Sequence, residues 1–268
     1  MADLLEPVTV RSGWQWFTTG FVRYRRNPAL MIFWVMTYWT LLGLAGLIPV
    51  LGDLAVAALA PVLLVGVLAG CRALDQEPGL PTVKVLFSGF GPRFQPLMAL
   101  GILHFLLTMG VLALTALVDG GVLLQLLARS ALGVADASLP DPDSLSPAAL
   151  LLAVVAYVPV MLAFAYAPLL VAWRGFGLGK SLFFSLVGSW RAWRGLLGLL
   201  AAILFFGVFL PTLVMSLLLG AGLNDALVTS VVIVPMLAIL APTIVSAFYT
   251  SYGRVIPDTE GAPPAQSV

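Results

Sequence analysis

The chain has 268 residues, of which 61% are hydrophobic and only 9% are charged, and its mean hydropathy is +1.07. Soluble domains carry about 25% charged residues, so this composition excludes a water-soluble globular protein and predicts a single integral membrane domain over residues 1–268. The net charge of +1 gives no reason to expect nucleic-acid binding, and the single cysteine excludes an internal disulfide and a thiolate metal cluster.

The first half of the chain predicts two short surface helices and three spans. A surface helix is expected at residues 12–27, where Trp14, Phe17, Phe21 and Tyr24 share one face. A hydrocarbon core of about 30 Å needs roughly 20 apolar residues in a helix. In chain order the predicted elements are the span 29–51, the span 54–74, a surface helix at 82–95 and the span 97–118. The first apolar run is too long for a signal peptide and is expected to remain as a span.

The second half begins with a loop at residues 119–147, where a helix over 121–134 precedes an acidic, proline-rich linker. The elements that follow are the span 148–173, a surface helix at 179–193 and the spans 195–220 and 226–249. The tail 257–268 is expected to be disordered. The fold class is therefore an all-α membrane protein with six transmembrane helices. Prolines should bend spans four to six most.

The basic residues predict the orientation. Twelve of the thirteen Lys and Arg residues lie on one side of the predicted spans, and only Arg129 lies on the other. Cytoplasmic loops of membrane proteins carry the excess of Lys and Arg, so both termini are expected in the cytoplasm.

An internal repeat is also expected. Each cytoplasmic segment resembles an amphipathic helix that leads into an odd-numbered span, and each even-numbered span contains an Ala-Pro pair, at Pro61, Pro168 and Pro242. The simplest account is three copies of one unit, made of a surface helix and two spans. Arginine with aromatic residues is also common wherever chains leave a bilayer, so chance similarity is the alternative.

The candidate binding residues are the cations of the three surface helices and their flanks. Together with neighbouring aromatic side chains they suit the headgroup level, where they would bind anionic lipids or a soluble partner protein, although simple anchoring is the alternative. They are Arg23, Arg25, Arg26, Lys84, Arg93, Arg174, Lys180, Arg191 and Arg194.

Inside the predicted spans there is little chemistry. His104 is the one histidine, and a hydrogen bond to a neighbouring helix is expected for it in preference to metal binding or proton transfer. Cys71 is expected to be a small packing residue. No charged residue lies at the centre of a predicted span, which disfavours ion-coupled transport. No catalytic constellation, cofactor motif or metal cluster is present in the sequence, so an enzyme is not expected.

Several motifs carry a resemblance to a known family. They are Arg11-Ser-Gly-Trp-Gln-Trp16 and Tyr24-Arg-Arg-Asn-Pro28 before the first span, Leu47-Ile-Pro-Val-Leu-Gly-Asp53 after it, and Leu117-Val-Asp-Gly-Gly121 after the third. With them the chain resembles a family of uncharacterised proteobacterial six-span inner-membrane proteins. It resembles more distantly the membrane domain of some glycerophosphodiester phosphodiesterases, whose catalytic domain this sequence lacks. The resemblance implies a bacterial inner membrane and no activity.

Two functions remain open at this point. The first is a non-enzymatic protein whose surface helices organise lipids or bind a partner at the cytoplasmic face. The second is a permease or flippase-like carrier of an apolar or lipid-derived molecule. A mid-membrane cavity lined by Thr108, His104 or Tyr157 would favour the carrier.

Overall fold

The structure, a computed structural model, describes residues 8–48, 51–76, 81–125, 146–224 and 228–256. Within these ranges six helical segments are long and apolar enough to cross a membrane, in agreement with the predicted number of spans. The spans are Pro28–Gly46, Gly52–Gln76, Phe94–Asp119, Pro147–Arg174, Trp193–Gly220 and Thr229–Val255. The predicted tail and residues 126–145 of the predicted loop lie outside the described ranges.

The contacts divide the chain into two units. The first consists of Met1–Thr40, Leu63–Ser88 and Gly188–Val268, and the second of Leu41–Val62 and Gly89–Val187. The first unit holds α1 (Val10–Arg26), most of α2 (Pro28–Gly46), the second half of α3 (Gly52–Gln76), α9 (Trp193–Leu204), α10 (Leu210–Gly220) and α12 (Val234–Val255). The second holds the start of α3, α4 (Phe94–Asp119), α6 (Pro147–Ala165), α7 (Ala167–Arg174) and most of α8 (Leu178–Arg191).

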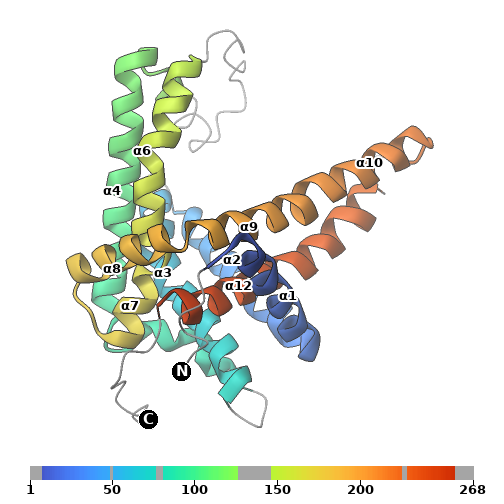
Figure 1. Ribbon diagram of the computed structural model, residues 1–268, viewed down its shortest axis with the longest axis horizontal. Coiled ribbons are helices and arrows are strands. Elements are labelled where there is room, and N and C mark those ends of the chain that lie inside the picture. The colour runs from blue at the N-terminus through green and yellow to red at the C-terminus, as the bar shows by residue number, and fades with distance from the viewer. Residues whose placement is uncertain (1–7, 49–50, 77–80, 126–145, 225–227, 257–268) are drawn as a thin grey trace. The chain divides into compact units, whose positions relative to one another are not determined.

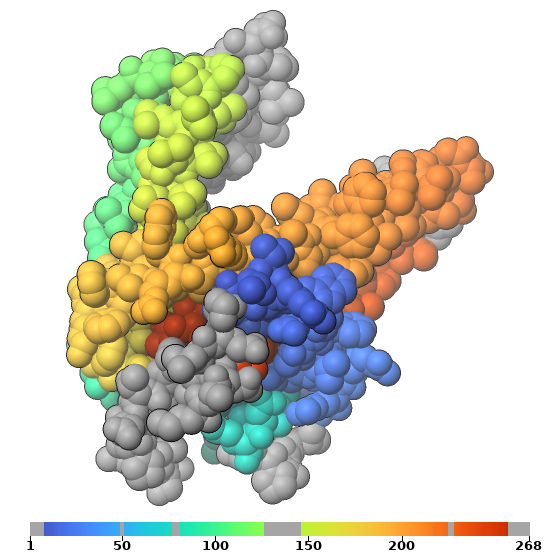
Figure 2. Space-filling model, in the orientation of Figure 1, coloured from blue at the N-terminus to red at the C-terminus, as the bar shows by residue number. Residues whose placement is uncertain are grey.

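In the first unit, α1 packs against both α9 and α12. Figure 2 shows the blue atoms of α1 directly against the orange atoms of α9. Glycines allow this close approach, since a Cβ on Gly13 would overlap the backbone of Gly195 and Leu199, and a Cβ on Gly20 would meet the backbone of Thr243 and Ala247. The buried face of α1 therefore contains small residues beside aromatic ones.

This packing corrects the predicted face of the first surface helix. Phe17 and Tyr24 are buried as part of the protein core, whereas Trp14 and Phe21 are exposed. The buried stripe is centred on Gly13 and Gly20, because a helix approaches its neighbour most closely where it lacks side chains.

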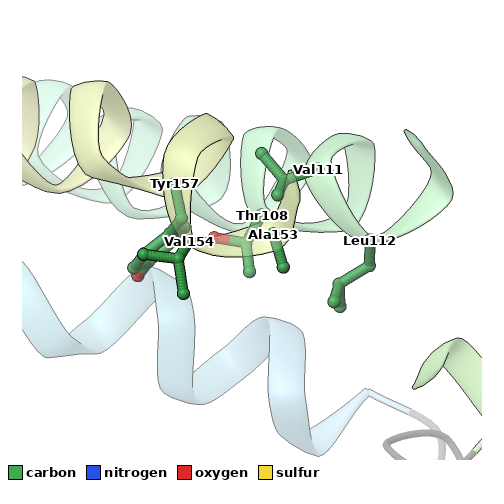
Figure 3. Close-up of a pocket in the computed structure, with 6 residues that line it drawn as sticks. All are labelled: Thr108, Val111, Leu112, Ala153, Val154 and Tyr157. Atoms are coloured by element: carbon green, nitrogen blue, oxygen red, sulfur yellow. The ribbon is translucent and has the colours of Figure 1, made fainter. Parts of the chain in front are cut away.

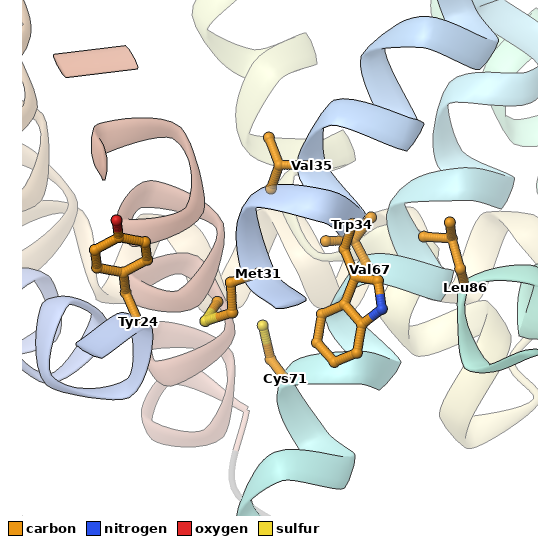
Figure 4. Close-up of a cluster of buried hydrophobic side chains, with 7 residues drawn as sticks. All are labelled: Tyr24, Met31, Trp34, Val35, Val67, Cys71 and Leu86. Atoms are coloured by element: carbon orange, nitrogen blue, oxygen red, sulfur yellow. The ribbon is translucent and has the colours of Figure 1, made fainter. Parts of the chain in front are cut away.

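The core of the first unit contains a cluster of buried side chains from α1, α2, α3 and the 3₁₀-helix η2 (Val83–Phe90). Figure 4 shows Trp34 and Met31 of α2 facing Val67 and Cys71 of α3. Gly70 provides the space for the Trp34 indole, because a Cβ there would lie 2.5 Å from the ring. Cys71 is fully buried, as expected for a packing residue.

The second surface segment is not the single helix predicted at residues 82–95. It forms η2, stops at Gly91 and Pro92, and α4 begins at Phe94. The residue before a proline is disfavoured in the helical conformation, so the Gly-Pro pair separates the two elements.

In the second unit, α4 and α6 lie side by side, as the green and yellow ribbons of Figure 1 show. The chain bends at Tyr166, between α6 and α7, where a side chain enters the helical hydrogen-bond pattern. The Tyr166 N–H donates to Ser185 Oγ of α8 at 2.9 Å, and the Ser185 hydroxyl donates to the Leu162 carbonyl at 3.0 Å. This insertion, next to Pro168, explains the bend of span four.

Spans five and six each contain a π-helical turn, η4 (Phe205–Phe209) and η5 (Thr229–Ile233). Pro211 and Pro235 follow these turns closely. A proline has no N–H to donate and its ring clashes with the carbonyl four residues earlier, so the helix widens just before it. Spans five and six therefore depart from regular α-helix at the turns before these prolines.

Candidate functional site

A polar cluster of the first unit surrounds Arg23, which is 8% exposed. Its Nε and Nη2 atoms donate to the two carboxylate oxygens of Asp75 on α3, at 3.0 and 2.7 Å. Its Nη1 atom donates to the Ser246 carbonyl and hydroxyl and to the Thr250 hydroxyl on α12. The guanidinium carbon lies 4.9 Å from the ring centroid of Tyr249. One side chain of α1 thus joins α3 and α12.

The guanidinium of Arg23, predicted to bind lipids or a partner, is engaged within the protein. A bidentate ion pair with a carboxylate is among the strongest interactions that an arginine makes. The remaining Nη1 group of Arg23 donates to acceptors on α12. Arg26 lies beside the pair, with Nη1 3.6 Å from Asp75, but its own side chain is 62% exposed. Arg23 therefore holds helices together, while Arg25 and Arg26 remain exposed on α1.

The partners of Arg23 were not predicted from the sequence. Asp75 directly follows the second predicted span, on the side of the membrane that holds most Lys and Arg residues. An acid in this position indicates an ion pair with one of those cations. Thr243, Ser246 and Thr250 recur every three or four residues along the last span, which predicts one polar stripe on an otherwise apolar helix.

The remaining candidate cations are placed at the ends of helices. Lys84, Arg93, Lys180, Arg191 and Arg194 are exposed, and Arg174 ends α7 with partial exposure. Arg93 lies against Gly175, Lys180 lies over the ring of Phe176, and the Arg194 guanidinium lies 5.4 Å from the ring centroid of Trp193. Two of these cations, Lys180 and Arg194, therefore make cation–π contacts with neighbouring aromatic rings.

The buried and exposed faces of α8 differ in the size of their side chains. Its buried stripe consists of small residues, Ser181, Ser185, Ser189 and, just beyond its end, Ala192. Its large side chains point outward instead, and Phe183 and Trp190 are 61% and 66% exposed. In water the aromatic face would be buried and the serines exposed, so this helix is built for apolar surroundings.

In the second unit, His104 of α4 faces α6. Its Nε2 atom lies 3.2 Å from the Tyr157 hydroxyl, and its ring lies 4.8 Å from that of Phe164. The expected hydrogen bond to a neighbouring helix is confirmed. Such a bond contributes about 0.6 kcal/mol to the association of membrane helices.

Close to this pair lies a pocket of about 210 Å³ between α4 and α6. Figure 3 shows its lining residues, Thr108, Val111, Leu112, Ala153, Val154 and Tyr157. The Thr108 hydroxyl donates to the His104 carbonyl at 2.9 Å, and the Tyr157 hydroxyl pairs with the His104 ring. With both hydroxyls engaged, the wall of the pocket offers hydrocarbon to an occupant.

Comparison with known proteins gives one informative relative. No family model matches the chain, and no solved structure matches it. A protein of Burkholderia thailandensis described as a probable inner membrane protein is 33% identical over 258 residues, which cover 92% of each chain. Identity at this level along nearly the whole of both chains shows common ancestry, and the six apolar helices agree with it. The chain is therefore a multi-spanning membrane protein that belongs to the same inner membrane protein family as the Burkholderia protein.

Proposed function

We propose that this protein is a non-enzymatic component of the inner membrane that binds anionic lipids of the inner leaflet through α8 and the cations around it. The observation that carries the proposal is the outward aromatic face of α8, with Phe183 and Trp190 exposed and three serines buried. Lys180, Arg191 and Arg194 flank this face. Aromatic rings at the headgroup level and cations beside anionic lipids are the two elements of an interfacial binding surface.

The orientation is part of the proposal. The excess of Lys and Arg on one side supports placing both termini and α8 in the cytoplasm. The inner leaflet carries the anionic lipids that attract cations, by about 1 kcal/mol each near the surface. The same reasoning leaves Arg25, Arg26 and Lys84 as further candidates for contact with lipid or with a protein partner.

We also propose that the chain consists of three repeats of a surface helix and two spans. Similar packing beside the Ala-Pro pairs supports this. Gly20 of α1 meets the backbone of Thr243 in the last span, and Gly89 of η2 meets the backbone of Val62 in the second. In both cases the contacted residue, Thr243 or Val62, directly follows the proline of an Ala-Pro pair. In span four the Ser185 hydroxyl of α8 contacts Tyr166, two residues before the proline.

The lipid proposal predicts that the double substitution Arg191→Glu with Arg194→Glu lowers the amount of anionic lipid retained. The protein would be purified into lipid nanodiscs containing phosphatidylglycerol and phosphatidylcholine, and the retained lipids would be quantified by native mass spectrometry. Each cation contributes about a factor of five, so the loss of two cations alone should reduce phosphatidylglycerol retention about 25-fold, and the two new acids should reduce it further.

The matched control is Arg11→Glu, which changes an exposed cation on α1 that is not among the candidate lipid-binding residues. Retention of phosphatidylcholine should remain the same in every variant. If the double variant retains as much phosphatidylglycerol as the wild type, α8 does not bind anionic lipid.

A carrier of apolar molecules is the second candidate, favoured by the pocket between α4 and α6. Its hydrocarbon wall suits an acyl chain better than a polar solute. Accelerated movement of a fluorescent phospholipid between the leaflets of proteoliposomes, lost in Ala153→Trp, would support the carrier. An unchanged rate relative to empty vesicles would exclude it for that lipid.

A further inference from the structure

The turn that joins α7 to α8 in the second unit gathers cations without acids. Gly175 ends α7 in the left-handed conformation, with φ +66°. The Arg93 side chain, from the start of α4, lies directly on this glycine, since a Cβ there would be 2.6 Å from Nη2 and 3.3 Å from Cζ. Glycine is therefore needed at this position both for its φ and for the space that the guanidinium occupies.

A second cation lies against the same turn. The Lys180 ammonium is 4.2 Å from the ring centroid of Phe176 and 5.9 Å from that of Phe184. The two rings pack together with their centroids 5.6 Å apart. Arg93 thus contacts residue 175 and Lys180 contacts residue 176, so two cations from different elements converge on one short segment.

The described residues provide no acid to balance this charge. No ion pair among them involves Arg93 or Lys180. Of the described acids of this unit, Asp119 ends α4 on the far side, about 39 Å along the helix from Arg93. Asp53 lies about one turn of α3 from Ala57, whose backbone contacts Gly101 of α4. Gly101 itself lies about two helical turns along α4 from Arg93. The described residues of this unit therefore place no carboxylate beside Arg93 and Lys180.

From this geometry we infer that Arg93 and Lys180 bind the phosphate of an anionic phospholipid. The guanidinium offers a planar set of donors to phosphate oxygens, and the ammonium adds a point charge. Phe183 and Phe184 of α8, exposed by 61% and 45%, provide an apolar surface next to Lys180 for the start of the acyl chains. This site rests on the proposed function and specifies two of its residues, Arg93 and Lys180, and the phosphate that they bind.

The test uses the full-length protein in nanodiscs that contain phosphatidylglycerol and phosphatidylcholine. Arg93→Gln and Lys180→Gln are each expected to reduce phosphatidylglycerol retention about fivefold, and the double variant about 25-fold. Arg11→Gln, which removes an exposed cation of α1 that is not among the candidate lipid-binding residues, is the matched control and should change nothing. Lys180→Arg should keep retention near that of the wild type.

Three outcomes would contradict the inference. Retention by the Arg93→Gln/Lys180→Gln variant equal to that of the wild type would remove these residues from any lipid site. If that variant is normal while Arg191→Glu/Arg194→Glu loses lipid, the general proposal survives and this site does not. If the wild type retains no more phosphatidylglycerol than the Arg93→Gln/Lys180→Gln variant but binds inorganic phosphate at millimolar concentration, the site takes free phosphate and not a lipid.

Discussion

Asp75→Asn is expected to lower the free energy of unfolding by about 3 kcal/mol, because it leaves the buried guanidinium of Arg23 without its counterion. Removing one partner of a buried ion pair costs about 3–5 kcal/mol, and the lower end applies here because the Asp75 side chain is 30% exposed. Asparagine has the shape of aspartate, so the packing of α3 is preserved and the charge alone is lost. The measurement is thermal unfolding of each purified variant in nanodiscs of one lipid composition.

Two comparisons separate this effect from a general loss of surface charge. Arg25→Gln removes an exposed cation two residues away on the same helix and should change stability by less than about 0.5 kcal/mol. The double variant Arg23→Met/Asp75→Leu should be more stable than Asp75→Asn, because it removes both charges together. A stability of Asp75→Asn equal to that of the wild type would show that Arg23 does not depend on this carboxylate.

Gly20→Ala should destabilise the protein by about 2–3 kcal/mol, although the substitution adds only one methyl group. The new Cβ would lie 2.6 Å from both Ala247 N and the Thr243 carbonyl oxygen. These are backbone atoms of α12, which cannot rotate away as a side chain would. Helix α1 would have to move away from α12, and the hydrogen bonds between Arg23 and α12 would lengthen.

Gly253→Ala is the control for this prediction. Gly253 also lies in a helix, and a Cβ there has no neighbour within 4 Å. That variant should be as stable as the wild type or more so, since alanine favours helix over glycine. Equal effects of the two substitutions, measured by thermal unfolding in nanodiscs, would contradict the close packing of α1 on α12.

The six spans could be predicted because length and hydropathy are local properties of the sequence. Each span is defined by about 20 consecutive apolar residues, whatever the rest of the chain does. The π-helical turns before Pro211 and Pro235 are also local, since a proline disturbs the turn that precedes it. The break at Gly91 and Pro92 was present in the sequence too, but the periodic aromatic residues on either side concealed it.

The faces of the surface helices could not be predicted in the same way. Which face of α1 is buried depends on Gly13 and Gly20 meeting the backbones of α9 and α12, segments more than 180 residues away. The aromatic residues of α8 do recur at helical spacing, but they face outward because the serines are buried. The burial of Ser185 follows from its hydrogen bonds at the bend around Tyr166. The role of Arg23 likewise required the position of Asp75, 52 residues further along.

The lipid proposal depends most directly on the side of the membrane on which α8 lies. The decisive measurement is labelling of single cysteines in intact cells with a membrane-impermeant maleimide, in a Cys71→Ala background. We predict that Asp143→Cys is labelled from outside, whereas Lys180→Cys is labelled only after the membrane has been permeabilised. Labelling of Lys180→Cys in intact cells, with Asp143→Cys protected, would place α8 at the outer leaflet and contradict the account.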